Sequence, residues 1–86
     1  MTVHTIVLKG KTYYEDYYRL ESRDLLTAAT YVGEIIAELR AAGVPDDHMT
    51  VRAELDAAPY AVEIEVYATP AQAAILGWAA PAPDEA

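Results

Sequence analysis

The chain has 86 residues, a formal net charge of −8 and no cysteine. A chain of this length forms one domain around one small core, which we place at residues 1–80. The lack of cysteine excludes a disulfide framework, a cysteine-ligated zinc site and thiol catalysis. No apolar run reaches the ~18 residues of a membrane span, and the first residues do not resemble a signal peptide. We therefore expect a cytoplasmic protein that does not contact a membrane.

The negative charge is concentrated in the second half of the chain. Residues 1–45 contain six acidic and five basic residues, whereas residues 46–86 contain eight acidic residues and Arg52 as the one base. Proteins that bind nucleic acid need basic groups to displace the counterions of the phosphates. We therefore expect no direct nucleic-acid binding, and a protein partner with basic character fits the charge better.

Two strands are predicted at the start of the chain, over residues 3–8 and 12–21, because both segments are rich in β-branched or aromatic residues. Lys9-Gly10-Lys11 is predicted to form a three-residue hairpin loop, which pairs Leu8 with Thr12. Alternation places the aromatic residues of the second strand on both faces of the sheet. Tyr14 and Tyr18 share one face with Leu20, and Tyr13 and Tyr17 share the other.

A long helix is predicted over residues 23–42, with Ser22 as its N-cap and Gly43 just beyond its end. Apolar residues recur at helical spacing and form one stripe. The stripe consists of Leu25, Ala28, Ala29, Val32, Ile35, Ile36 and Leu39.

Two further strands are predicted, at residues 49–55 and 60–67, because apolar and polar residues alternate in both segments. Pairing Val51 with Ile64 sets Arg52 against Glu63, which favours this register over a two-residue slip. Thr69-Pro70 is typical of a helix start, and the short helix is predicted to reach residue 79. Residues 81–86 are predicted to form a flexible acidic tail. The fold class is therefore α+β, in ββαββα order, with a four-stranded antiparallel sheet, one long helix on one face and a short C-terminal helix.

Two candidate binding surfaces follow, and we expect them to be separate. The first is aromatic: Tyr13, Tyr17 and Val7 are expected on the face opposite the helix, where a partner or a second copy would cover them. Tyr14 and Tyr18 belong to the same cluster, although they also fit a role at the edge of the core. The second surface is acidic and comprises Glu54, Asp56, Glu63 and Glu65. It is interpreted as a solvated face, a docking surface for a basic partner or a catalytic carboxylate pair.

No motif for a cofactor, a phosphate or a nucleophile is present, so we expect no enzymatic activity and no cofactor. Asp46-Asp47-His48 could contribute metal ligands, but their spacing matches no known metal-binding loop, so a solvated loop explains these residues better and no metal site is predicted. The sequence favours a non-enzymatic protein-interaction module, homodimeric through its first hairpin, that modulates a larger protein. The alternative is an acidic mimic of nucleic acid, or an antitoxin-like or anti-defence inhibitor of a basic protein. A ligand pocket between sheet and helix is a third hypothesis, and it would need a polar group inside.

Overall fold

Two β-hairpins meet through their longer strands and form one antiparallel sheet. The computed structural model describes residues 3–78. The sheet has the order β1-β2-β4-β3, and the elements follow one another as predicted. They are β1 (His4–Leu8), β2 (Lys11–Ser22), α1 (Leu25–Ala41), the 3₁₀ turn η1 (Asp46–His48), β3 (Met49–Glu54), β4 (Tyr60–Ala68) and α2 (Pro70–Leu76). The α+β fold class is therefore confirmed, while the predicted tail, residues 81–86, lies outside the described residues.

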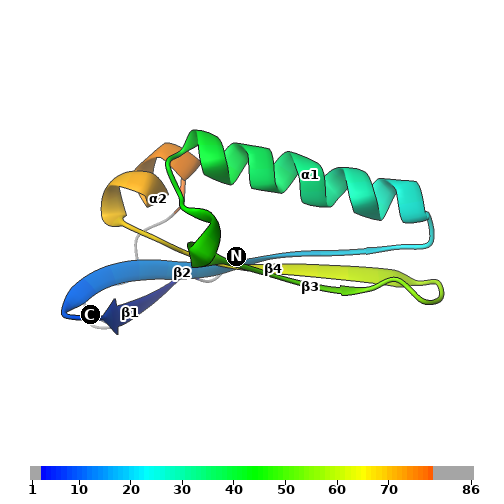
Figure 1. Ribbon diagram of the computed structural model, residues 1–86, viewed down its shortest axis with the longest axis horizontal. Coiled ribbons are helices and arrows are strands. Elements are labelled where there is room, and N and C mark those ends of the chain that lie inside the picture. The colour runs from blue at the N-terminus through cyan, green and yellow to red at the C-terminus, as the bar shows by residue number, and fades with distance from the viewer. Residues whose placement is uncertain (1–2, 79–86) are drawn as a thin grey trace.

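Both helices lie on the same side of the sheet (Figure 1), so the opposite face of the sheet is left uncovered within residues 3–78. α1 packs over the two central strands, β2 and β4, and α2 packs beside its C-terminal end. The side chains that point toward the helices form the core, and Leu39, Val62, Ile64 and Val66 are its largest fully buried apolar members. None of the described helices is long and apolar enough to cross a membrane.

The register of the first hairpin differs from the prediction by one residue. Leu8 pairs with Lys11, so the loop contains only Lys9 and Gly10. Both loop residues have positive φ, 51° and 77°, as a type I′ turn requires. Because side chains alternate along a strand, a shift of one residue moves every side chain of β1 to the opposite face of the sheet. Val7 therefore lies on the helix side of the sheet and not beside Tyr13 and Tyr17, and the predicted position of Val7 is wrong.

The start of α1 also differs from the prediction. β2 continues through Ser22, and the helix begins at Leu25 with Asp24 as its N-cap. The Asp24 carboxylate accepts the Thr27 N–H at 3.2 Å, and the Ser22 hydroxyl accepts the Asp24 N–H at 3.0 Å. Ser22 therefore shapes the turn before the cap. At the other end the helix ends as predicted, with Gly43 at a φ of 90°.

The second hairpin has the predicted register. Val51 pairs with Ile64 and Arg52 with Glu63, and alternate residues of β4 are buried beneath α1. The C-terminal helix starts at Pro70 with the predicted Thr69 cap but ends at Leu76, where Gly77 adopts a left-handed conformation. Within the described residues the core also contains one carboxylate, Asp16, which is 2% exposed.

Candidate functional site

The sheet face that points away from the helices is the candidate site, and we call it the open face. Its side chains come from all four strands because β2 and β4 pair in the centre of the sheet. The strands contribute His4, Ile6 and Leu8, then Lys11, Tyr13, Glu15, Tyr17, Arg19 and Glu21, then Ala61, Glu63, Glu65 and Tyr67, and finally Thr50, Arg52 and Glu54.

The open face unites the two surfaces that were predicted to be separate. Tyr17 pairs with Glu65 and Arg19 with Glu63 across the β2–β4 ladder. The prediction of two separate surfaces is therefore wrong, because it did not establish that β2 and β4 are neighbours in the sheet.

The other predicted site residues have different positions. Tyr14 and Tyr18 point inward and pack against the core, and the Tyr18 hydroxyl accepts the indole N–H of Trp78 at 3.0 Å. Val7 is exposed, but on the helix side. Asp56 follows the end of β3 and lies in the loop of the second hairpin.

Two carboxylates lie side by side near the middle of the open face, and we call Glu15 and Glu65 the carboxylate pair. The Tyr17 hydroxyl donates to Glu65 Oε2 at 3.0 Å and also lies 3.5 Å from Glu15 Oε1. The pKa of Glu15 is raised above its usual value, first by burial and then by the hydrogen bond with Glu65 and its charge. The pKa of Tyr17 is raised too, chiefly because its hydroxyl donates to Glu65. The pair therefore carries negative charge that its neighbours only partly compensate.

An aromatic cluster borders the carboxylate pair. The His48 ring stacks on Tyr67 with a centroid distance of 4.3 Å, and Tyr13 meets both rings edge-on at 5.4 and 5.6 Å. The Tyr67 hydroxyl donates to the Asp47 carbonyl at 3.2 Å, which ties η1 to β4. Since Glu15 is opposite Tyr67 in the sheet, aromatic rings and carboxylates form one continuous surface.

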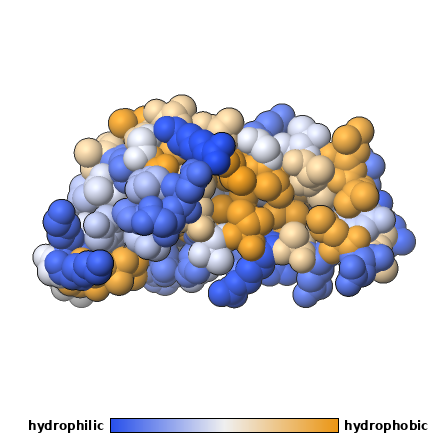
Figure 2. All heavy atoms as spheres, viewed as in Figure 1, coloured by the Kyte–Doolittle hydropathy of each residue, from blue (hydrophilic) through white to orange (hydrophobic). Residues whose placement is uncertain are grey.

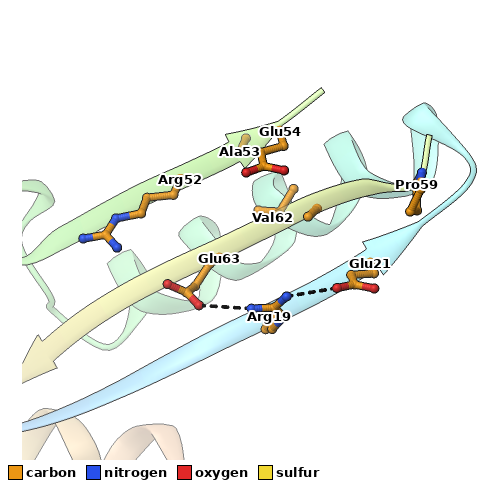
Figure 3. A pocket seen from close by; sticks show the side chains of 9 residues that line it. Arg19, Glu21, Arg52, Ala53, Glu54, Pro59, Val62 and Glu63 are labelled. Atoms are coloured by element: carbon orange, nitrogen blue, oxygen red, sulfur yellow. Dashed lines mark hydrogen bonds and ion pairs between the residues drawn. The ribbon is translucent and has the colours of Figure 1, made fainter. Parts of the chain in front are cut away.

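A row of charged residues crosses the open face toward the second hairpin (Figure 3). Arg19 donates to Glu21 at 2.9 Å and lies 3.6 Å from Glu63, so acids already compensate its charge. Arg52 is opposite Glu63 in the sheet, but within the described residues it makes no ion pair. These residues line a pocket of about 560 Å³. Its walls carry three glutamates and two arginines, so the pocket has mixed charge with a small excess of negative charge.

The possible metal ligands in η1 do not converge. The Asp46 carboxylate binds Arg40 through two hydrogen bonds of 2.9 Å, and this contact lowers the pKa of Asp46. The His48 ring packs in the aromatic cluster instead of facing Asp46. Among residues 3–78 no group of three or more histidine, aspartate or glutamate side chains could hold a metal ion.

Sequence reasoning missed three residues of the site: Glu15, Tyr67 and His48. The alternation along residues 60–67 places Tyr67 on the same side as Glu63 and Glu65, so this signal was present in the sequence. What the sequence does not reveal is the pairing of β2 with β4, which brings Glu15 beside Glu65 and Tyr67.

A surface of carboxylates, phenols and an imidazole can bind a cation by charge, hydrogen bonds and ring contacts. No protein-family model, curated protein or solved structure matches this chain.

Proposed function

We propose that this chain is a non-enzymatic protein-interaction module that binds a basic side chain of a partner protein on its open face. The observation that carries this proposal is the carboxylate pair, because the pKa of Glu15 is raised in part by its like-charged neighbour Glu65. Like charges on directly neighbouring strands lower the stability of a sheet. A guanidinium or ammonium group placed between the two carboxylates would relieve that repulsion.

The surroundings of the pair support a cationic group over a neutral one. The aromatic cluster of Tyr13, His48 and Tyr67 lies next to the pair, and the ring faces of tyrosines attract cations. Tyrosine also provides a large contact area with a polar tip, which is typical of protein interfaces. His4 on β1 is opposite Glu15, and its charge lowers the pKa of Glu15 less than burial and Glu65 raise it.

The mixed charge of the open face argues against nucleic-acid mimicry. Lys11, Arg19 and Arg52 lie among its glutamates, so the face does not repeat negative charge as a phosphate backbone does. Inhibition of a basic protein remains compatible with the proposal, because it would use the same contact. Dimerisation through the aromatic residues of the first hairpin has less support, because Tyr14 and Tyr18 pack inward.

The proposal is tested by titrating the ¹⁵N-labelled protein with a short arginine-rich peptide and with its citrulline counterpart, which has the same shape but no charge. We expect saturable shifts at Glu15, Tyr17 and Glu65 with the arginine peptide only, and weaker binding as salt is added. The double variant Glu15→Gln and Glu65→Gln should lose most of this binding. Glu34→Gln on α1 is the matched control for a lost carboxylate, and it should bind as the wild type does.

The two possible outcomes are distinct. Equal shifts with the citrulline peptide, or undiminished binding by the double variant, would refute a cation site at the carboxylate pair. If the site is correct, affinity capture at low and high salt with the wild type and the double variant identifies the natural partner as the protein that only the wild type retains.

A further inference from the structure

One side of the molecule exposes an apolar band between α1 and β3. α1 packs over β2 and β4, so the inward side chains of β3 at the edge of the sheet are left uncovered. Val51 is 44% exposed although it is opposite the fully buried Ile64, and Leu55, just beyond the strand, is 45% exposed. Figure 2 shows hydrophobic surface in this position, between the helix and the second hairpin.

The facing flank of α1 is apolar as well. Thr27, Thr30 and Tyr31 flank a pocket with Leu20 of β2, which fixes the β2 side of the helix. Helical spacing then turns the opposite flank toward β3. That flank carries Leu25, Ala29 and Ile36, and Leu25 is 46% exposed. The band therefore combines a helix flank and a strand that the described residues leave without a covering element.

β3 is also a free edge of the sheet. Among residues 3–78 it pairs with β4 on one side only, so its other side presents backbone N–H and C=O groups to an incoming strand. Residues 50–54 are all exposed. An edge strand beside an exposed apolar band is suited to strand addition, and the charges of β3 indicate which strand it would accept.

We propose that two copies of this chain pair antiparallel through β3, across a two-fold axis perpendicular to the sheet at Ala53, and form a continuous eight-stranded sheet. This register sets Arg52 against Glu54 of the second copy, and the symmetry makes the same contact twice. It also sets Val51 against Leu55 of the second copy, which covers the apolar band on both molecules.

The charges select this register over its neighbours. Pairing that preserves the faces must shift in steps of two residues. A shift of two residues in one direction places Arg52 opposite Arg52 of the second copy. The same shift in the other direction places Glu54 opposite Glu54 of the second copy. Only the register centred on Ala53 pairs Arg52 with Glu54, and Arg52 makes no ion pair within the described residues that would compete.

The test uses charge reversal and sedimentation equilibrium. Arg52→Glu alone and Glu54→Arg alone each set like charges opposite one another at two positions, so each should weaken self-association at least about tenfold. An equimolar mixture of the two variants should associate as a heterodimer, because both contacts then pair Glu with Arg. Lys11→Glu on β2 and Glu34→Arg on α1 carry the same charge changes away from β3 and should dimerise as the wild type does.

A cysteine scan tests the β3–β3 register independently. It gives a result even if the charge variants do not fold. The chain has no cysteine, so Val51→Cys, Arg52→Cys and Ala53→Cys each introduce a single thiol. On mild oxidation Ala53→Cys should form the disulfide-linked dimer fastest, because only residue 53 faces its own counterpart across the axis. A wild type that stays monomeric at millimolar concentration overturns the proposal, as does a mixture of the charge variants that fails to associate.

The dimer does not depend on the proposed function, and the two fail separately. The carboxylate pair lies on β2 and β4, away from the β3 edge, so the Glu15→Gln and Glu65→Gln double variant should dimerise normally. A wild type that dimerises but does not bind the arginine peptide contradicts the proposed function alone, and a wild type that binds the peptide but stays monomeric contradicts the dimer alone.

Discussion

At the scale of single residues, Glu15, Tyr17 and Glu65 form an arrangement that we expect to lower stability at neutral pH. A sheet face that only needed solubility could separate its acids or pair each with a base, as Arg19 pairs with Glu21 and Glu63. Here one phenol hydroxyl lies within reach of two carboxylates, and the pKa of Glu15 is raised first by burial and then by the hydrogen bond and charge of Glu65. Such unrelieved charge on an exposed face is a feature of binding sites.

The pKa of Glu15 predicts how stability depends on pH. Its value in the folded state is raised above the ordinary 4.5, so the folded protein holds this proton more tightly than the unfolded chain. The associated stability is present below the unfolded pKa and is lost as pH rises through the folded pKa. Glu65→Gln removes the hydrogen bond and the charge that raise the pKa but keeps an acceptor for Tyr17. The variant should therefore be more stable than the wild type at neutral pH, by no more than ~0.5 kcal/mol for an exposed pair.

Urea unfolding at pH 7 and pH 4 checks this prediction, because the advantage of Glu65→Gln should shrink at the lower pH as the carboxylates become protonated. Glu34→Gln, an exposed change on α1, should show no comparable gain at either pH. If Glu65→Gln instead lost stability at neutral pH, Glu65 would stabilise the sheet. The carboxylate pair would then not be a source of repulsion in the folded protein.

At the scale of elements, the periodicity of apolar residues was sufficient to predict a helix or strand where one of its faces is clearly buried. The alternation in β4 predicted both its inward residues and its register with β3, and the apolar stripe predicted α1 to within a few residues. The first hairpin was harder, because Lys9-Gly10-Lys11 allows either a two-residue or a three-residue loop. A lysine at positive φ is uncommon, so the pattern did not indicate the type I′ turn.

The two-residue turn makes a prediction that depends on backbone geometry alone. Gly10 has a φ of 77°, where an added Cβ is strained even though its path is open, so Gly10→Ala should destabilise the protein by ~1 kcal/mol. Gly33 lies inside α1, and an added Cβ there meets nothing within 4 Å, so Gly33→Ala should stabilise it by up to ~1 kcal/mol.

Chemical denaturation of the two variants beside the wild type measures both effects. The same substitution is thus expected to have opposite signs at the two sites. If Gly10→Ala left stability unchanged, the loop would have to adopt another conformation, such as the three-residue loop that the sequence allowed.

At the scale of the whole molecule, the pairing of β2 with β4 determines the candidate site, and the sequence did not reveal it. Each hairpin could be predicted alone from local alternation, but the contact between hairpins joins residues that are far apart in the chain. β2 and β4 are the longest strands, so placing them in the centre satisfies most backbone groups. This order brings the aromatic strand of the nearly neutral half beside the acidic strand of the other half.

The C-terminal part of the described chain is joined to the same unit. The Trp78 indole donates to Tyr18 on β2, and the Gln72 side-chain amide donates to the Gly43 carbonyl beyond α1 at 2.8 Å. These contacts connect α2 with both the central sheet and the end of the long helix. Since Trp78 is buried and is the one tryptophan of the chain, its fluorescence reports the docking of α2.

We therefore expect the chain to unfold as one cooperative unit. Urea transitions followed by Trp78 fluorescence and by far-ultraviolet circular dichroism should coincide at a fixed protein concentration. Tyr18→Phe leaves the buried indole N–H without its acceptor, so it should move both transitions together to lower urea, equivalent to a loss of ~1 kcal/mol. A fluorescence transition that precedes the loss of secondary structure would contradict this, because it would mean that α2 undocks while the sheet and α1 remain folded.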